Sequence, residues 1–287
     1  MGYHKPRTVK EACSLLASAG TTPIAGGTDV LIKMRRGALR NTTLVSLDDI
    51  DGLSGIRETG DGIEIGSGTK LSTVASDERL ATFFPAIGQG ALNVGTPQIR
   101  NLGTIGGNIC NASPCADTAP GLLVSSALVV ASNGDRERTI PIGEFWSGPG
   151  RNNLEKGEMV TAFLLPKPDR ERRQGFMKLG PRRAADIAIV NMAMSLFVRD
   201  GVCTDVRIAL GSVAPTPIRA SSAEKMMESV AVDKLDFAAI AEATADDARP
   251  ISDVRGTAWY RREALCALST GLLETLLGGE GRVICHG

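Results

Sequence analysis

The sequence predicts an α+β protein with two domains, and three observations lead to this prediction. The 287 residues exceed the usual size of one domain, although one large unit is still possible. Apolar residues recur at helical spacing near both ends, and short apolar runs bounded by glycine or proline lie between them. A highly charged stretch over 167–173 follows Pro166, so we expect one domain over residues 1–166 and a second over 167–287.

The N-terminal elements have clear local signals. Thr8–Glu11 is a capping box, so a helix is expected from there to Gly20. The apolar run Pro23–Ala25 predicts a strand that leads through a glycine turn into a helical turn over 30–34. Further strands are expected over 44–47 and 63–65, followed by a helix over 71–84.

Residues 94–120 have no apolar period and are rich in glycine, asparagine, threonine and proline. This composition predicts a long loop, and a loop of this length in a compact domain is usually functional. The Asn133-Gly134 turn predicts a hairpin between strands over 128–131 and 138–141. The other expected elements are strands over 159–165, 187–198 and 206–213 and helices over 220–230, 236–248 and 257–277.

Composition narrows the possible functions. Lys plus Arg and Asp plus Glu both total 32, so no chain-wide field would attract nucleic acid or an anionic membrane. The N-terminus has no apolar signal region, and no stretch has the apolar length of a membrane span. We therefore expect a cytoplasmic protein without a nucleic-acid partner. Its six cysteines lack CxxC spacing, as is typical of a reducing compartment: Cys13, Cys110, Cys115, Cys203, Cys266 and Cys285.

Several catalytic classes lack their residues. Both histidines lie near the ends, at His4 and His286, so a Ser-His-Asp or Cys-His site inside a pocket is not expected. The zinc-protease motif and the Walker phosphate loop are absent, and we expect no bound metal. Gly66–Leu71 nearly matches the dinucleotide fingerprint, but a leucine stands in place of the third glycine. Cys110 and Cys115 are interpreted as buried small hydrophobic residues.

Two glycine pairs are more informative than these motifs. They lie in Ala25–Asp29 and Thr104–Asn108, where each pair is flanked by a threonine. Paired glycines adopt backbone conformations that let successive N–H groups converge on an anion, and the threonine adds a hydroxyl donor. Two such segments could hold one diphosphate from two sides. The alternative is that each pair only makes a tight turn.

Polar residues follow the second glycine segment. Asp117 could accept hydrogen bonds from ribose hydroxyls, as acidic residues do in other dinucleotide sites. Alternatively, it caps the stretch that begins at Pro120. The residues by themselves leave both interpretations open.

Taken together, these motifs resemble the FAD-binding medium subunit of the molybdenum hydroxylases, the family of xanthine dehydrogenase and carbon monoxide dehydrogenase. The long glycine-rich motif is highly specific, and no cysteine-rich insertion follows it, so no iron–sulfur cluster is expected on this chain. The matching segments run across nearly the whole chain: Pro23–Asp29, Gly95–Asn101, Thr104–Pro114, Lys178–Arg183, Asp186–Ala188 and Asp253–Gly256.

The resemblance implies an FAD-binding domain of the vanillyl-alcohol-oxidase (PCMH) type and a smaller C-terminal domain with an antiparallel sheet and helices. It implies that the glycine segments hold the FAD diphosphate, with Val160 near the adenine or ring system and Lys178 near the flavin or its nucleotide partner. The alternative for Lys178 is a solvated surface lysine. The implied cofactor-binding residues are Ile24, Ala25, Gly26, Gly27, Thr28, Asp29, Thr104, Ile105, Gly106, Gly107, Asn108, Asn111, Asp117, Val160 and Lys178.

The function implied is that of a flavin subunit in a heteromeric molybdenum hydroxylase. The molybdenum cofactor and 2Fe-2S clusters are expected only on a large and a small partner subunit. Electrons would pass from the iron–sulfur clusters to FAD and on to NAD or another acceptor, and no side chain of this chain need act as a catalytic acid or base. Two alternatives are a self-contained flavin oxidase and a non-catalytic assembly protein that has kept the fold and lost its cofactor.

Overall fold

The computed structural model describes residues 2–182 and 185–278, and the chain divides into two compact units. Two segments from the first half of the chain belong with the C-terminal unit. A domain boundary near residue 166 stays a prediction. Cys285, His286 and Arg183 lie outside the described residues. Unit 1 consists of Met1–Val74, Thr96–Ser113 and Ser126–Pro168, and unit 2 consists of Ala75–Gly95, Pro114–Ser125 and Asp169–Gly287.

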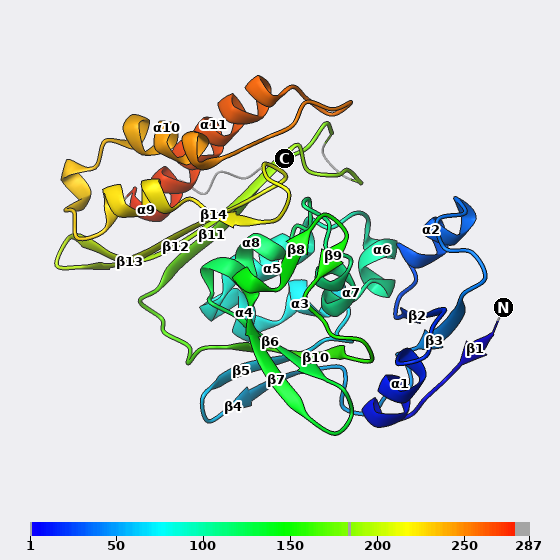
Figure 1. Cartoon of the computed structure of the whole chain (residues 1–287). Coiled ribbons are helices and arrows are strands. Elements are labelled where there is room, and N and C mark those ends of the chain that lie inside the picture. Colours follow the sequence, from blue (N-terminus) through cyan, green and yellow to red (C-terminus); the bar gives the residue numbers. More distant parts are fainter. Residues whose placement is uncertain (1, 183–184, 279–287) are drawn as a thin grey trace. The chain divides into compact units, whose positions relative to one another are not determined.

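Unit 1 begins with a small parallel sheet and two helices (Figure 1). The elements are β1 (Tyr3–His4), α1 (Val9–Leu16), β2 (Thr21–Ile24), α2 (Val30–Arg35) and β3 (Thr43–Ser46), with the strand order β1-β3-β2. The Thr8 hydroxyl accepts a hydrogen bond of 3.2 Å from the Glu11 N–H, which confirms the predicted helix start. The helix ends at Leu16, earlier than predicted. Cys13 of α1 and Val45 of β3 belong to the small core between them.

The larger sheet of unit 1 is antiparallel. Its strands are β4 (Ile56–Thr59), β5 (Gly62–Gly66), β10 (Met159–Leu165), β6 (Leu128–Ser132) and β7 (Glu137–Pro141), in that spatial order. The predicted hairpin is confirmed, because β6 pairs with β7 in antiparallel orientation. In its turn, the Asn133 side-chain oxygen accepts hydrogen bonds from the N–H groups of Asp135 and Arg136. Ile63 and Ile65 of β5 are fully buried on one face, whereas Glu64 between them lies on the other. The unit also contains η1 (Ile142–Glu144), β8 (Trp146–Gly148) and β9 (Arg151–Asn152).

The predicted loop over 94–120 is wrong, because this stretch contains two short helices and the start of a third. They are α6 (Pro97–Leu102) and α7 (Ile105–Cys110) in unit 1 and α8 (Ala119–Val124) in unit 2. Each has six residues, too few to show an apolar period in the sequence. Their signals are local: the hydroxyls of Thr96 and Thr104 accept hydrogen bonds from the third N–H of α6 and α7.

The helix predicted over 71–84 is also interrupted. The structure has α3 (Leu71–Ser76), α4 (Glu78–Phe83) and α5 (Pro85–Leu92). Asp77 causes the first break, because its carboxylate accepts hydrogen bonds from the N–H groups of Arg79 and Leu80 and so starts a new helix.

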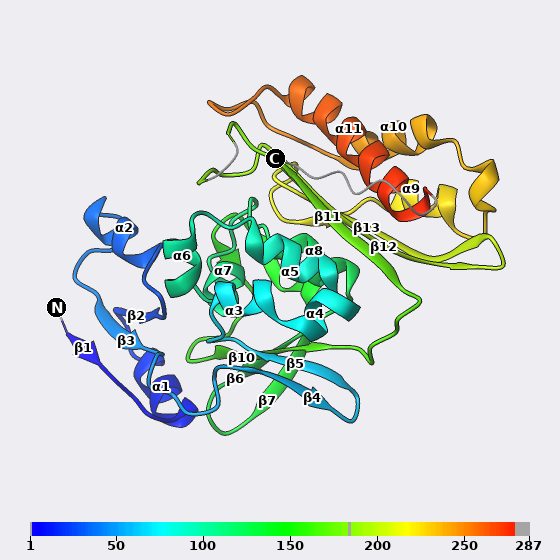
Figure 2. The ribbon, with the colours of Figure 1, turned by 180° about the vertical axis from the view of Figure 1, so that it is seen from behind.

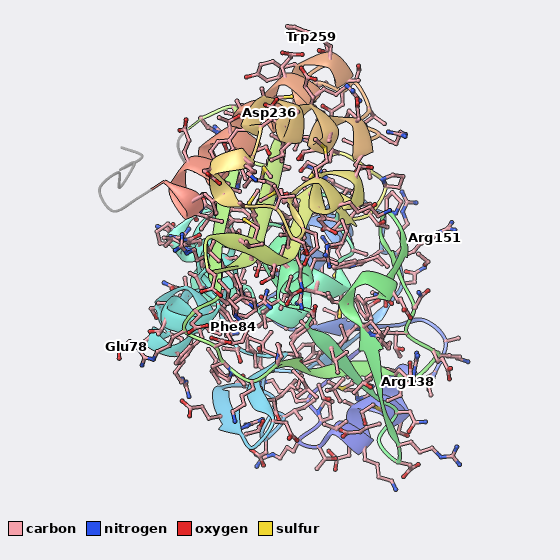
Figure 3. All side chains as sticks on the ribbon, turned by 90° about the vertical axis from the view of Figure 1, so that its left-hand side faces the viewer. Glu78, Phe84, Arg138, Arg151, Asp236 and Trp259 are labelled. Atoms are coloured by element: carbon pink, nitrogen blue, oxygen red, sulfur yellow. The ribbon has the colours of Figure 1, made fainter. Side chains whose placement is uncertain are left out.

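Unit 2 is built on a four-stranded antiparallel sheet (Figure 2). Its strands, in spatial order, are β11 (Arg173–Leu179), β12 (Val190–Arg199), β13 (Val202–Gly211) and β14 (Ile218–Arg219). The predicted C-terminal helices are confirmed as α9 (Ser221–Met227), α10 (Phe237–Asp247) and α11 (Ala258–Leu277), with η2 (Val232–Lys234) after α9. Trp259 projects from the first turn of α11 (Figure 3).

The two faces of this sheet carry different helices. Helices α9, α10 and α11 cover one face, and α5 and α8 lie against the other (Figure 1). The α9–α11 face packs an apolar core that includes Met192, Met194 and Leu273. The other face places Lys178 and Asn191 toward the loop that precedes α8. Among the described residues, no helix is long and apolar enough to cross a membrane.

Candidate functional site

The two glycine segments lie side by side in unit 1. A methyl group on Gly26 would lie 1.9 Å from the carbonyl oxygen of Leu102 and 2.8 Å from the nitrogen of Gly103. A methyl group on Gly103 would in turn lie 3.7 Å from the Thr28 hydroxyl oxygen. Only glycine permits this approach of main chain to main chain, so Gly26 brings the first segment against the residues that enter the second.

The first segment has open main-chain donors. It connects β2 to α2, and Gly27 has a φ of +70°, in the left-handed region that favours glycine. The carbonyls of Gly27 and Asp29 accept hydrogen bonds from α2. Within the described part of the chain, the N–H groups of Gly26, Gly27, Thr28 and Asp29 donate no hydrogen bond. Because buried or half-buried N–H groups normally find a partner, this loop has the donors that an anion requires.

The second segment differs from its prediction. The N–H of Ile105 donates to the Thr69 carbonyl at 3.0 Å, that of Gly106 to the Ser67 carbonyl at 2.8 Å, and that of Gly107 to the Thr104 hydroxyl at 3.0 Å. The expectation that these N–H groups are all available to an anion is therefore wrong. They are used to start α7 and to hold it against residues 67–69.

The two glycines of the second segment have different roles. A methyl group on Gly106 would lie 2.6 Å from the Ser67 carbonyl oxygen, so glycine is required there for packing. A methyl group on Gly107 would meet only the Thr104 hydroxyl oxygen, at 3.1 Å, and Gly107 is exposed. Gly107 therefore leaves an open main-chain surface at the start of α7.

Two further contacts connect the predicted residues of unit 1. The Lys33 ammonium on α2 donates to the Asn111 side-chain oxygen at 2.6 Å, which ties α2 to the end of α7. The Ser67 hydroxyl donates to the carbonyl of Val160 on β10 at 2.7 Å, so Val160 is linked through Ser67 to Gly106. Sequence reasoning missed Lys33, which lies in no recognisable motif, and it missed Ser67, because the segment Gly66–Leu71 matches the dinucleotide fingerprint only incompletely.

Asp117 and Lys178 lie together in unit 2. The Lys178 ammonium donates to Oδ2 of Asp117 at 2.8 Å, to the Asn93 carbonyl at 2.9 Å and to the Asp186 carbonyl at 3.2 Å, and it also lies 3.2 Å from Oδ1 of Asp186. An ammonium has three N–H donors, so these contacts use them all. Asn191 donates to the other oxygen of Asp117 at 2.7 Å. We call Asp117, Lys178, Asp186 and Asn191 the charge cluster.

The charge cluster is buried and carries one more carboxylate than cations. The side chains of Lys178, Asp117 and Asp186 are only 5–6% exposed. Burial raises the pKa of Asp117 above its ordinary value, and the Asp186 carboxylate adds to this effect, whereas Lys178 and Asn191 oppose it. A solvated Lys178 is therefore excluded. The capping interpretation of Asp117 is also wrong, because Thr118 is the N-cap of α8.

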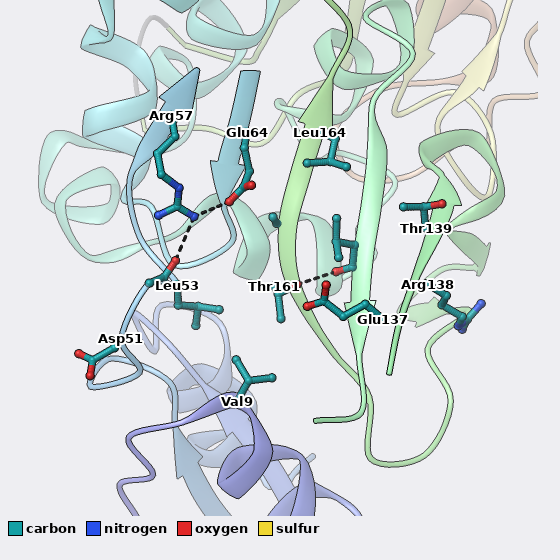
Figure 4. A pocket seen from close by; sticks show the side chains of 13 residues that line it. Val9, Asp51, Leu53, Arg57, Glu64, Glu137, Arg138, Thr139, Thr161 and Leu164 are labelled. Atoms are coloured by element: carbon teal, nitrogen blue, oxygen red, sulfur yellow. Dashed lines mark hydrogen bonds and ion pairs between the residues drawn. The ribbon is translucent and has the colours of Figure 1, made fainter. Parts of the chain in front are cut away.

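A cavity elsewhere in unit 1 is separate from these residues. It has a volume of about 610 Å³ and lies against β5, β10, β6 and β7, beside the start of α1 (Figure 4). The ion pair of Arg57 with Glu64 and the apolar side chains of Leu53 and Leu164 line it. None of the predicted cofactor-binding residues does. The cavity is therefore not the predicted cofactor site.

Comparisons with known proteins identify both parts of the chain. Residues 1–168 match the family model described as the FAD binding domain in molybdopterin dehydrogenase, and residues 176–276 match the CO dehydrogenase flavoprotein C-terminal domain. The xanthine dehydrogenase FAD-binding subunit of Escherichia coli is 31% identical over 282 residues, which are 97% of each chain. The carbon monoxide dehydrogenase medium chain of Afipia carboxidovorans is 34% identical over 264 residues, which are 90% of each chain.

A solved structure agrees with these relatives. A chain in the crystal structure of cyanide-inactivated Cu,Mo-CO dehydrogenase superimposes with a TM-score of 0.91 at 30% identity, over 96% of this chain and 97% of that one. The two family matches and this superposition agree over nearly the whole chain. This protein belongs to the family of FAD-binding medium subunits of the molybdenum hydroxylases, the oxidoreductase family of xanthine and carbon monoxide dehydrogenases.

Proposed function

We propose that this chain holds FAD in a heteromeric molybdenum hydroxylase whose other chains are a molybdenum-cofactor large subunit and an iron–sulfur small subunit. FAD, when bound, would supply the chemistry that passes electrons from the iron–sulfur subunit to NAD or another acceptor. The names of the relatives, medium chain and FAD-binding subunit, support the assignment to a multi-subunit enzyme.

One observation carries the proposal. The Gly26 main chain lies against Leu102–Gly103, and the adjoining N–H groups over 26–29 have no partner within the described residues. These donors suit the diphosphate of FAD, because main-chain N–H groups bind phosphate oxygens without adding a charged side chain. The predicted residues of unit 1 therefore fit the cofactor.

The candidate residues of unit 1 would contribute to FAD binding through their positions around the ligand. Thr28 offers a hydroxyl beside the open N–H groups, and Gly107 leaves room for a ligand at the start of α7. Lys33 places a positive charge at Asn111, which favours a bound anion nearby. No side chain of this set needs to transfer a proton, since they bind and orient the cofactor.

Asp117 and Lys178 would act differently. Contacts with the charge cluster and with the Asn93 carbonyl occupy the three ammonium donors of Lys178 and both carboxylate oxygens of Asp117. A contact of either group with FAD would therefore share or replace one of these partners. We propose that the charge cluster fixes the loop before α8, and that any FAD contact made by Asp117 uses a remaining lone pair.

Measurement of bound FAD tests the proposal. The purified chain is expected to be yellow and to release one FAD per chain on denaturation. Gly107→Val would place a branched side chain on the open surface of α7 and is expected to give a folded, colourless protein, with Gly107→Ala intermediate. A wild-type protein that refuses FAD, or Gly107→Val with full FAD content, would contradict the proposed site.

The electron acceptor needs a separate experiment. In the purified complex, substrate-reduced enzyme is mixed with NAD or with an artificial dye, and reoxidation of the flavin is followed by absorbance. Oxidation by NAD at a rate that supports turnover identifies it as the acceptor. A chain that oxidises a small alcohol with O₂ in the absence of other subunits would instead establish a self-contained oxidase.

A further inference from the structure

Helix α2 is fixed only weakly by packing. None of its six residues is buried, and Leu31 and Ile32 are each 47% exposed. A helix this short is not stable by itself, so its position depends on contacts with the rest of unit 1. Among the described residues, its side chains make one hydrogen bond to another element, from the Lys33 ammonium to Oδ1 of Asn111 at 2.6 Å. This hydrogen bond therefore has unusual weight in holding α2.

The partner of Lys33 is itself held firmly. Asn111 is the C-cap residue of α7, and the last carbonyls of a helix have no partner within the helix. Here the strands β8 and β9 supply the donors. The Trp146 indole and the Asn152 side chain donate to the carbonyls of residues 109 and 110, at 3.1 and 3.0 Å. Asn111 is thus a fixed point to which the mobile partner, Lys33, is attached.

Lys33 and Gly26 contact opposite ends of the second glycine segment. Gly26 lies against the main chain just before that segment, and Lys33 contacts Asn111 just after it. The first segment and α2 are therefore joined to the second segment at two points. Along the chain, the open N–H groups over 26–29 and the open surface at Gly107 lie between these two points.

The two contacts differ in how easily they open. A methyl group on Gly26 would lie 1.9 Å from the Leu102 carbonyl oxygen, so the main chains there are packed against each other. The contact of Lys33 with Asn111 is one hydrogen bond from an exposed side chain, and water can replace such a bond at little net cost. Its opening moves α2, which has no buried residue to expose. The contact at Lys33 therefore opens more easily.

The charge of Lys33 is not paired with a carboxylate. Among the described residues, the neutral amide oxygen of Asn111 is its one hydrogen-bond acceptor. An ammonium has three N–H donors, so two of them remain. Lys33 also follows the open donors by one helical turn, because its N–H donates to the Asp29 carbonyl at 3.0 Å. An anion bound by those donors would therefore attract Lys33 and favour the closed contact.

We propose that the hydrogen bond between Lys33 and Asn111 is a latch that closes the FAD site, and that Lys33 is a positioning residue for the loop over 25–29. This inference rests on the proposed function, because it assigns that loop to the FAD diphosphate. When the latch is open, the loop and α2 move away from α7, and FAD enters or leaves. When the latch is closed, the loop stays beside α7 and FAD is retained.

The rate of FAD release from the purified chain tests the latch. Lys33→Met and Asn111→Leu each remove the hydrogen bond and keep a side chain of similar size. Each is expected to raise the dissociation rate about threefold to tenfold, as measured by the fluorescence of free FAD after dilution. Because both changes open the same contact, the double variant should release FAD no faster than Lys33→Met alone.

The matched control is Arg36→Met, at the C-cap of the same helix. Arg36 is exposed, and its side chain has no hydrogen bond or ion pair among the described residues. The control removes the same charge from α2 without touching the latch, so the dissociation rate should stay at the wild-type value. An equal increase for Arg36→Met and Lys33→Met would assign the effect to net charge and overturn the latch.

The melting temperature of the flavin-free chain separates positioning from stability. It should be the same for wild type and Lys33→Met, because the substituted side chain is exposed. A lowered value would make Lys33 a structural residue and overturn the proposal. So would an unchanged dissociation rate, or a double variant whose increase is the product of the two single increases. These three results leave the proposed function standing, whereas a wild-type chain that refuses FAD would overturn both.

Discussion

The glycine segments of unit 1 and the charge cluster of unit 2 were predicted to serve the same ligand, but they are built in opposite ways. The segment over 25–29 is main chain with unused N–H donors. In the charge cluster, Asp117 and Lys178 are buried and already partnered. The difference indicates that substitutions in the cluster change stability first, whereas substitutions in the glycine segments change cofactor binding first.

Lys178→Met is expected to give the largest effect on stability. It keeps the apolar stem but leaves Asp117 and Asp186 without their shared cation, and removing one partner of a buried pair costs about 3–5 kcal/mol. Urea unfolding measures the loss. The loss should be smaller at acidic pH, because the raised pKa of Asp117 lets this carboxyl take up a proton and lose its charge.

The control for this variant is Lys225→Met on α9. Lys225 is exposed, so its substitution should change the free energy of unfolding by less than about 0.5 kcal/mol. If Lys178→Met also changed the free energy of unfolding by less than this amount but released FAD, the charge cluster would serve mainly to bind the cofactor. The proposed difference between the cluster and the glycine segments would then be wrong.

Gly26→Ala is expected to have the next largest effect on stability. Its methyl group would overlap the Leu102 carbonyl oxygen, 1.9 Å away, so the two glycine segments must move apart. Overpacking of this kind costs about 1–3 kcal/mol. The bound FAD per chain should fall with it.

The matched control is Gly60→Ala, since nothing lies within 4 Å of a methyl group there. Flavin absorbance and urea unfolding are measured for both variants. A Gly26→Ala protein with full FAD content would show that the apposition of the segments is not needed for binding.

The smallest expected effect is a dependence of the free energy of unfolding on pH that arises from Asp117. Its pKa is raised in the folded protein, so as pH rises above the ordinary value of 3.8 the unfolded state loses its proton first. The contribution of Asp117 to stability is therefore complete below pH 3.8 and declines until the raised pKa is passed. The Asp117→Asn variant has no carboxyl at this position, so its stability should not show this decline.

The difference in unfolding free energy between wild type and Asp117→Asn isolates this contribution. It is needed because other carboxylates, such as Asp205 and Asp253, have lowered pKa values and act with the opposite sign. A difference that stays constant from pH 4 to pH 8 would contradict a raised pKa for Asp117.

The elements with local signals could be predicted from the sequence. Thr8 marks the start of α1, and the Asn133-Gly134 turn marks the β6–β7 hairpin. β1 was missed because its two residues pair only with β3, and a two-residue strand has no period of its own. Helices α6 and α7 were missed for a related reason, although the threonine caps at 96 and 104 were visible.

The sequence singled out residues for the candidate site, but it did not reveal the contacts between them. Binding of an anion by the main chain of the glycine pairs stays a prediction, whereas the structure shows that a side chain cannot fit at Gly26 or Gly106. Asp117 and Lys178 are 61 residues apart, and Asn191 is 74 residues from Asp117. Sheet pairing and helix packing bring them together, which no local pattern reveals. No local pattern reveals either that the N–H groups over 105–107 donate to acceptors in residues 67–69 and to the Thr104 hydroxyl.

The contact of Gly26 with Leu102 has a consequence for how the protein is made. During synthesis the loop over 25–29 leaves the ribosome long before α6, so for that time it lacks the neighbour that completes its surface. With FAD held at the proposed site, we expect the nascent chain to acquire its coenzyme only after this long-range closure, late in biogenesis. A yellow colour would then report that unit 1 has finished folding.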